Sequence, residues 1–306
     1  MKVAIIGQQD FGKAVLEKLL ARGDEITAVF CAPEKEGARP DALRVAAQAA
    51  GLKVHQFKSL KAPEAVEAMK EANADIGIMA YVLQFAPEEF VNIPKHGTIQ
   101  YHPSLLPKYR GPSSISWPII CGEQETGLTI FRPSDGLDEG PIILQKKTPI
   151  GPDDTLGTVY FDRLFPQGVD AMIEAADLIL AGKHKEVVQD ESQATYEGWC
   201  RDNESKINWA NHATIVHRLI RGCNPAPGAW TTFNGTKLWV YDCTLEPVRT
   251  FGAVKGKIGE VVESGDGKIV VTSQNGRFHI TKAKLGDAKK ANADTFNIPV
   301  GTILGN

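Results

Sequence analysis

The chain has 306 residues, enough for one large domain or two ordinary ones with a substantial buried core. It is 42% hydrophobic and 23% charged with a formal net charge of −3, which is typical of a globular protein and argues against chain-wide attraction to nucleic acid or an anionic membrane. No apolar run reaches the roughly 18 residues that a membrane-spanning helix needs, and residues 1–7 lack the features of a signal peptide.

The cysteines are few, scattered and odd in number, and they form no CxxC pair. They are Cys31, Cys121, Cys200, Cys223 and Cys243. This usage is typical of reduced thiols and argues against a structural zinc site. We therefore predict a cytoplasmic protein that binds no metal.

The first half of the chain alternates between two hydrophobic patterns. Short β-branched runs, typical of buried strands, occur at residues 2–6, 26–31, 53–57, 76–80 and 97–101. Stretches with apolar residues on one helical face occur at residues 11–22, 41–50 and 63–72. Strands that alternate with helices pair in parallel through right-handed crossovers. This half therefore predicts an α/β fold with a doubly wound, mostly parallel sheet.

The second half begins with two more predicted strands and one long helix, at residues 126–131, 141–147 and 156–181. A polar stretch without a clear period follows, and then a helix at residues 213–221. Short runs separated by glycine-rich turns come last, at residues 238–241, 257–262, 268–272 and 277–281. With the hairpin signal Ser264-Gly-Asp-Gly267, they predict a small antiparallel β-barrel similar to the five-stranded oligonucleotide-binding type. The expected domains are residues 1–182 and 206–306, joined by a linker at 183–205.

The first glycine turn resembles a phosphate-binding loop but lacks the chemistry of one. Residues 7–14 follow a strand, precede a helix and nearly match G-x-x-x-x-G-K-[ST]. The last position is Ala14, which has no hydroxyl to bind magnesium, and the spacing does not fit G-x-G-x-x-G either. We expect a tight strand-to-helix turn at Gly7 and Gly12, and no nucleotide site.

Side chains suited to acid–base chemistry come at the end of a predicted strand. Gln100 and His102 project from the same face of that strand, and Pro103 ends it. Ligands of doubly wound sheets bind at the carboxyl ends of strands, and histidine titrates near neutral pH. Asp138, flanked by Gly136 and Gly140, is the best candidate for a carboxylate that orients the imidazole.

These residues sit in motifs that resemble the folate-dependent formyltransferase family. The resemblance covers nearly the whole chain. Within the family, the chain most resembles the hydrolase domain of 10-formyltetrahydrofolate dehydrogenase. It is carried by Ile6-Gly-Gln-x-x-Phe-Gly12, Gln84-Phe85, Tyr101-His-Pro-Ser-Leu-Leu-Pro107, Arg110-Gly111, Gly136-Leu-Asp-x-Gly140, Phe165-Pro166, Ala194-Thr-Tyr-Glu-Gly198, Lys206-Ile-Asn-Trp209, Ile220-Arg-Gly222 and Pro227-Gly-Ala-Trp230.

The resemblance implies a formyltransferase-like, Rossmann-type catalytic domain, a C-terminal barrel, and 10-formyltetrahydrofolate as formyl donor. It also implies that His102 and Asp138 are catalytic residues. The family's catalytic asparagine, which helps to polarise the formyl oxygen in the transferases, is replaced by Gln100 here. The pterin is expected in a slot lined by residues 80–87. The candidate folate-binding residues are Tyr81, Val82, Leu83, Gln84, Phe85 and Leu137.

The acceptor stays open at this level. Water and a small amine both fit, and no membrane partner is expected. Methionyl-tRNA formylation is disfavoured because residues 32–42, where such enzymes carry a basic insertion, are short and charge-balanced. A non-catalytic folate-binding module is the remaining alternative, and the presence of both His102 and Asp138 argues against it.

Overall fold

The computed structural model describes residues 1–248 and 255–305, so residues 249–254 and Asn306 of the expected C-terminal domain lie outside the described residues. The chain forms two compact units, and neither is continuous in sequence. The N-terminal unit comprises Met1–Gly111, Gly127–Thr148 and Phe161–Tyr196. The C-terminal unit comprises Pro112–Thr126, Pro149–Tyr160 and Glu197–Asn306.

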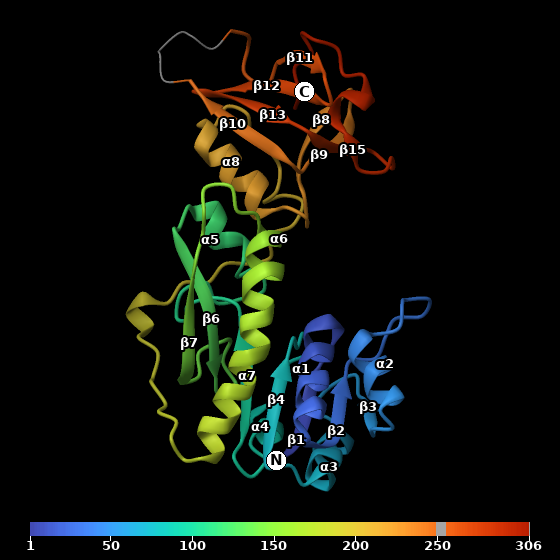
Figure 1. Cartoon of the computed structure of the whole chain (residues 1–306), viewed down its shortest axis with the longest axis vertical. Helices are drawn as coiled ribbons and strands as arrows, with labels where there is room; N and C mark the ends of the chain where they lie inside the picture. Colours follow the sequence, from blue (N-terminus) through green and yellow to red (C-terminus); the bar gives the residue numbers. More distant parts are fainter. Residues whose placement is uncertain (249–254, 306) are drawn as a thin grey trace. The chain divides into compact units, whose positions relative to one another are not determined.

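A seven-stranded sheet with the order β3-β2-β1-β4-β5-β6-β7 forms the centre of the N-terminal fold (Figure 1). The strands are β1 (Lys2–Gly7), β2 (Glu25–Cys31), β3 (Val54–Gln56), β4 (Ile76–Ala80), β5 (Thr98–His102), β6 (Glu125–Phe131) and β7 (Ile142–Pro149). Neighbouring strands from β3 to β5 are parallel, and β6 is antiparallel to β5. The predicted doubly wound, mostly parallel sheet is confirmed.

Helices cover both faces of the parallel part of this sheet. They are α1 (Gln9–Arg22), α2 (Ala42–Ala49), α3 (Pro63–Ala72), α4 (Glu88–Val91) and α7 (Phe165–Leu180). On one face α3 and α4 pack on strand residues such as Ile6 and Phe30 in one core cluster. On the other, Phe11 of α1 stacks on Tyr101 of β5 and meets Phe165 of α7 edge-on. This packing holds the carboxyl ends of β4 and β5 in place.

The predicted helix at residues 156–181 is not continuous. It consists of α6 (Leu156–Val159), a π-helical turn η1 (Tyr160–Leu164) and then α7. Pro166 lies in the first turn of α7 and has no N–H to donate to the preceding turn. The α-helical hydrogen-bond ladder therefore breaks ahead of it, which is where a π-bulge is tolerated.

The C-terminal unit contains two four-stranded antiparallel sheets, ordered β10-β13-β12-β11 and β15-β14-β9-β8. Their strands are β8 (Ala229–Phe233), β9 (Thr236–Val240), β10 (Cys243–Pro247), β11 (Val261–Gly265), β12 (Lys268–Ser273), β13 (Gly276–Ile280), β14 (Lys282–Leu285) and β15 (Ala291–Asn292). Helices α5 (Ser116–Cys121) and α8 (Ala213–Gly222) and the short 3₁₀ turn η3 (Ala293–Phe296) accompany them. The predicted barrel-like domain is confirmed, with eight described strands where the five-stranded type was expected.

A shared core explains why these short strands fold together. Trp209, Phe278 and Ile280 are among the buried residues of one cluster that draws on both sheets and on α8. The predicted hairpin forms at Asp266 and Gly267, which both have positive φ and join β11 to β12. Two adjacent left-handed residues are the requirement of a tight hairpin turn.

The polar stretch 183–205 is not an unstructured connection. Residues 183–196 pack with the N-terminal unit, and residues 197–205 pack with the C-terminal unit. Within the first part, Val187 forms a β-bridge with Ile142, a 3₁₀ turn η2 (Glu191–Gln193) follows, and Tyr196 bridges Arg110. We call residues 187–196 the strap, because they contact the loop that follows His102 and the turn that carries Asp138.

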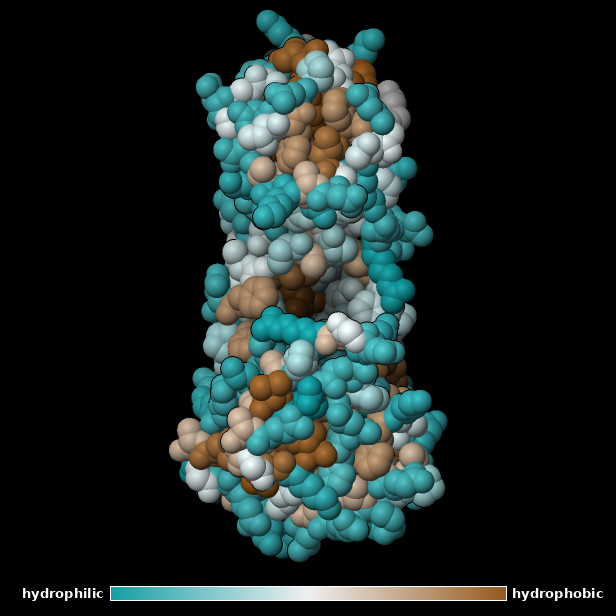
Figure 2. Space-filling model, turned by 90° about the vertical axis from the view of Figure 1, so that its right-hand side faces the viewer, coloured by the Kyte–Doolittle hydropathy of each residue, from teal (hydrophilic) through white to brown (hydrophobic). Residues whose placement is uncertain are grey.

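The molecular surface is mixed in polarity. Figure 2 shows one face on which hydrophilic residues predominate and hydrophobic residues gather in separate patches. Among the residues that the structure describes, no helix has the length and apolar character needed to cross a membrane. The exposed apolar side chains that concern the site are those of Tyr81, Leu83, Phe85 and Leu137.

Candidate active site

His102 is the last residue of β5 and is only 5% exposed. Its Nε2 lies 2.9 Å from the carbonyl oxygen of Tyr109. A carbonyl oxygen can only accept a hydrogen bond, so Nε2 carries the proton. The basic lone pair of the neutral ring is then on Nδ1, and this is the atom that can take up a proton.

The loop after β5 is pinned to the neighbouring strand. The Thr129 hydroxyl of β6 donates to the Ser104 carbonyl at 2.7 Å and accepts from the Leu106 N–H at 3.1 Å. Gln145 of β7 donates to the Leu106 carbonyl at 2.8 Å. Pro103 ends the strand, as predicted, and these bonds turn the following residues back toward His102.

Asp138 lies in the turn between β6 and β7 and is 9% exposed. It has a left-handed backbone with φ of 54°, a region that aspartate tolerates better than most residues. Its Oδ2 accepts a hydrogen bond from the Gly111 N–H at 2.9 Å. Gly140 is required for close approach rather than for a positive φ, because a Cβ there would overlap the Arg132 carbonyl oxygen.

The two side chains meet at the carboxyl end of β5. Nδ1 of His102 lies 3.6 Å from Oδ2 of Asp138, and both groups are shielded from water. The geometry thus places Nδ1, the nitrogen with the basic lone pair, beside a carboxylate. The pair can therefore withdraw a proton from a nucleophile and return it to a leaving group.

Gln100 lies two residues before His102 on β5, opposite Met79 of β4 and Phe131 of β6. Its side chain is partly buried. Among residues 1–248 and 255–305, no hydrogen bond to its carboxamide is found. An amide group is therefore available on the same strand face as the imidazole.

The six predicted folate-binding residues divide into two groups. Four apolar side chains are between 38% and 59% exposed: Tyr81, Leu83 and Phe85 in the segment after β4, and Leu137 in the turn that carries Asp138. A group of exposed apolar side chains is typical of a binding surface. Val82 instead packs against a core cluster, and Gln84 donates to the Phe57 carbonyl at 2.8 Å.

Two further contacts connect the loops that carry these residues. Met79 of β4 pairs with Gln100 in parallel register, so Tyr81 follows β4 at the sheet edge where His102 ends β5. The Glu88 N–H donates to the Asp135 carboxylate at 3.0 Å. The segment after β4 and the turn that carries Asp138 are therefore linked at one end of the sheet.

The glycine turn between β1 and α1 is occupied by the protein's own carboxylate. Oδ2 of Asp41 accepts from the Gln9 N–H at 2.8 Å, and Oδ1 accepts from the Leu43 and Arg44 N–H groups at 3.0 and 3.3 Å. Asp41 thus caps α2 while it fills the place of an anion at the start of α1. One N–H at the start of α1 is thus bonded within the protein.

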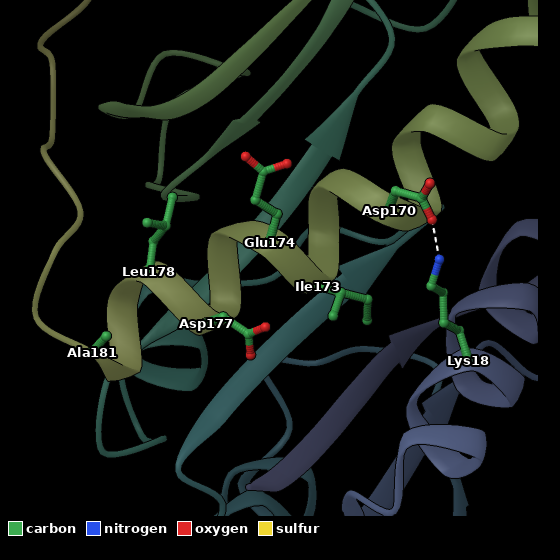
Figure 3. A pocket seen from close by; sticks show the side chains of 7 residues that line it. All are labelled: Lys18, Asp170, Ile173, Glu174, Asp177, Leu178 and Ala181. Carbon is green, nitrogen blue, oxygen red and sulfur yellow. Dashed lines mark hydrogen bonds and ion pairs between the residues drawn. The ribbon is translucent and has the colours of Figure 1, made fainter.

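A separate hollow of about 480 Å³ lies along α7 and α1 (Figure 3). Its acidic residues on α7 pair with cations of the same unit: Asp170 with Lys18, Asp177 with Arg22, and Glu174 with Lys146. None of the residues that line it is a predicted site residue. The acidic side chains in Figure 3 are therefore matched by charge, and we assign the hollow no part in the catalytic chemistry.

The sequence did not predict the roles of two residues at the site. Arg110 was named only as part of a motif, yet it is 8% exposed and forms two hydrogen bonds with Glu191, at 2.6 and 2.9 Å. Its partner Gln189 is 5% exposed and contacts the turn of Asp138. Gln189 lies in the stretch expected to be a linker, where no local pattern marked it.

Among the described residues, no group of three or more His, Cys, Asp or Glu side chains is placed to hold a metal ion. The polar side chains gathered at the end of β5 are an imidazole, a carboxylate and an amide.

The fold and the site first define a class: a doubly wound α/β catalytic domain with a buried imidazole–carboxylate pair at a strand end, followed by a barrel-like domain. Comparison with known proteins then gives the family. Residues 1–176 match the family described as formyl transferase, and residues 200–298 match the formyl transferase C-terminal domain. The chain belongs to the formyl transferase family.

Curated relatives match different lengths of the chain. The mitochondrial 10-formyltetrahydrofolate dehydrogenase of Homo sapiens is 38% identical over 295 residues, covering 91% of this chain and 32% of that protein. The chain thus spans about a third of that relative. The methionyl-tRNA formyltransferase of Geotalea uraniireducens (strain Rf4) is 32% identical and is matched over 100% of this chain and 98% of its own length.

Solved structures share the fold at low sequence identity. HypX from Aquifex aeolicus, solved with tetrahydrofolic acid, has a TM-score of 0.70 and 19% identity, with 97% of this chain and 46% of that chain covered. WlaRD, a sugar 3N-formyl transferase, has a TM-score of 0.68 and 20% identity, with coverages of 94% and 98%. At this level of identity the likeness establishes the fold.

Proposed function

We propose that this protein removes the formyl group from 10-formyltetrahydrofolate and passes it to water or to a small amine. The observation that carries the proposal is the buried contact between His102 Nδ1 and Asp138 Oδ2 at the carboxyl end of β5. Family membership and the relatives named for 10-formyltetrahydrofolate support the choice of donor.

His102 and Asp138 would act as a proton-transferring pair. Water or an amine attacks the formyl carbon while Nδ1 of His102 accepts its proton, and Asp138 stabilises the resulting imidazolium. The bond from the formyl carbon to N10 then breaks, and the proton passes from Nδ1 to N10. A new C–O or C–N bond replaces the C–N bond that is lost, and His102 returns to its starting state.

Gln100 would stabilise the negative charge that develops on the formyl oxygen. Its carboxamide is on the strand face of His102, and well-aimed donors at such a position contribute about 3–4 kcal/mol to transition-state stabilisation. The exposed side chains of Tyr81, Leu83, Phe85 and Leu137 would contact the pterin, whose flat apolar faces suit them.

The direct test is to incubate the protein with 10-formyltetrahydrofolate alone and follow formate and tetrahydrofolate. Formate release without an added amine identifies hydrolysis. Consumption of the donor only when small amines are added identifies transfer, and mass spectrometry of the formylated product then identifies the acceptor. A donor that stays intact under both conditions, although the protein binds it, identifies a non-catalytic folate-binding module.

Methionyl-tRNA formylation is the second candidate, and one observation favours it. The Geotalea relative matches over its whole length, which the dehydrogenase relatives do not. Against it, residues 32–42 remain short and charge-balanced. Formylation of charged initiator tRNA, with affinity that falls steeply as salt is raised, would establish this candidate.

A further inference from the structure

We propose that Gln189 of the strap is a positioning residue that holds Asp138 in register with His102. The inference rests on the proposed function, because positioning has meaning only for a reaction that uses this pair. Gln189 acts through the backbone around Asp138, and no role in touching the substrate is assigned to it.

The carboxamide nitrogen of Gln189 holds the turn of Asp138 by its backbone. Nε2 donates to the carbonyl oxygen of Asp138 and to that of Gly140, each at 2.8 Å. These two carbonyls flank the bend in which Asp138 adopts its positive φ. Both hydrogens of the amide are therefore used to fix the backbone that aims the carboxylate.

The carboxamide oxygen of Gln189 holds the other loop of the site. Oε1 accepts from Nη2 and Nε of Arg110, at 2.9 and 3.3 Å. The residues on either side of Arg110 are those that contact the catalytic pair. The Tyr109 carbonyl bonds His102 Nε2, and the Gly111 N–H bonds Asp138 Oδ2. One buried side chain thus joins the loop that orients the imidazole to the turn that carries the carboxylate.

Burial and side-chain type make this link specific. Gln189 is the only buried residue in the stretch 183–199, all of which the structure describes. Two donors must face two carbonyls while an acceptor faces a guanidinium, and only an amide supplies both. Glutamate would keep the pairing with Arg110 but set a carboxylate against two carbonyl oxygens. Methionine would match the length and remove all of the hydrogen bonds.

The main experiment compares Gln189→Met with Gln193→Met. Gln193 lies on the same strap, is exposed and donates from its carboxamide to Asp190, away from the catalytic pair, so it is a matched control. We expect Gln189→Met to lower kcat roughly 10- to 100-fold, because a shift of about 1 Å in a catalytic group costs up to about 10²-fold. KM for 10-formyltetrahydrofolate should stay within about twofold, because no predicted folate contact involves Gln189. Gln193→Met should keep both values.

Two further variants separate positioning from a general loss of structure. Gln189→Glu keeps an acceptor for Arg110, so it should fold, yet kcat should fall with KM unchanged. In an Asp138→Asn background, Gln189→Met should cost less than about twofold more, because the register of residue 138 with His102 matters little once its carboxylate is gone.

The outcomes distinguish this inference from the function on which it rests. If the wild-type protein turns over and Asp138→Asn does not, an unchanged kcat in folded Gln189→Met and Gln189→Glu overturns the role of Gln189 alone. Fully additive losses in the double variant overturn it as well. Absence of turnover by the wild-type protein in every assay overturns the proposed function and the role of Gln189 together.

Discussion

The end of β1 and the end of β5 lie at the same edge of one sheet, but they differ in whether their polar groups are already bonded within the protein. After β1, the Gln9 N–H at the start of α1 is already bonded to the carboxylate of Asp41. After β5, the Asp138 carboxylate faces an imidazole nitrogen, and the Gln100 amide has no bonded partner among the described residues. We infer that a strand end can take part in a reaction when its polar groups are held in place and are still free to bond a substrate. We assign the glycine turn a structural role because its Gln9 N–H already bonds a carboxylate of the protein.

The strongest test of this contrast is to make the same substitution at both carboxylates. Asp138→Asn and, independently, His102→Ala should fold normally and lose at least about 10²-fold in turnover, the usual cost of removing an acid–base group. Asp41→Asn should keep turnover within about twofold of wild type, since Asp41 satisfies only backbone groups. The measurement is steady-state release of formate or formylated product, with circular dichroism to verify folding.

Near-full turnover in either His102→Ala or Asp138→Asn would falsify the assignment of the pair. A loss in Asp41→Asn as large as in Asp138→Asn would show that the first turn also takes part in the reaction, and the contrast between the two turns would fail.

The glycines of the turn after β1 and of the β6–β7 turn that carries Asp138 offer a second comparison, in stability. A Cβ at Gly7 would overlap the Ala80 carbonyl oxygen, and one at Gly140 would overlap the Arg132 carbonyl oxygen. We expect Gly7→Ala and Gly140→Ala each to lose about 1–3 kcal/mol in the free energy of unfolding, because backbone atoms must move. Only Gly140→Ala should also lower kcat of the folded protein, because Gly140 belongs to the turn that carries Asp138.

Urea unfolding measures the stability of these variants, and Gly198→Ala is the control. No atom lies within 4 Å of a Cβ placed at Gly198, so its free energy of unfolding should change by no more than about 0.5 kcal/mol. Equal kcat losses in Gly7→Ala and Gly140→Ala would contradict the assignment of separate roles to the two turns.

Asp41 itself should matter for stability. Its removal in Asp41→Ala leaves the Gln9, Leu43 and Arg44 N–H groups without their acceptor. We expect a loss of about 0.5–2 kcal/mol in the free energy of unfolding, the range for helix N-caps, and a smaller loss in Asp41→Asn, which keeps one acceptor oxygen. Identical stabilities of wild type and Asp41→Ala in urea would refute this role.

The sequence predicted the N-terminal elements well because their signals are local. Apolar periodicity is read within one or two turns of helix, and the predicted helices at residues 41–50 and 63–72 agree with α2 and α3 within one residue. The second barrel run was predicted at residues 257–262, but β11 spans Val261–Gly265. Gly259 adopts a left-handed φ of 78° in a turn, so the strand begins only after it, a division that hydropathy alone does not reveal.

The site was only partly predictable for a related reason. A strand-end histidine and a glycine-flanked aspartate are visible as motifs, although their distance of 3.6 Å is not. Gln189 is 51 residues from Asp138 in sequence and meets it only through the fold. No periodicity marks a single buried amide in a polar stretch, so its contribution required the structure.

The smallest expected effect is on stability and concerns Glu34, whose carboxylate bonds the backbone of Asp41. The Asp41 N–H donates to Glu34 Oε1 at 3.0 Å, and this hydrogen bond, with those from Gln56 and Arg44, lowers the pKa of the Glu34 carboxyl from 4.5 to about 2. A carboxyl whose pKa is lower in the folded state stabilises the fold fully above its unfolded value and loses that effect as pH falls. The contribution of Glu34 should therefore be complete above pH 4.5 and decline between 4.5 and about 2.

The corresponding experiment follows the stability difference between wild type and Glu34→Gln as pH is lowered. Because glutamine cannot ionise, the wild-type advantage in urea unfolding should be constant from pH 7 to 5 and should shrink from pH 4.5 downwards. The exposed neighbour Glu36, changed to glutamine, serves as the control. An advantage that grows as pH falls would have the wrong sign for a carboxylate held by N–H donors, and would mean that the turn after β1 is not maintained by these bonds.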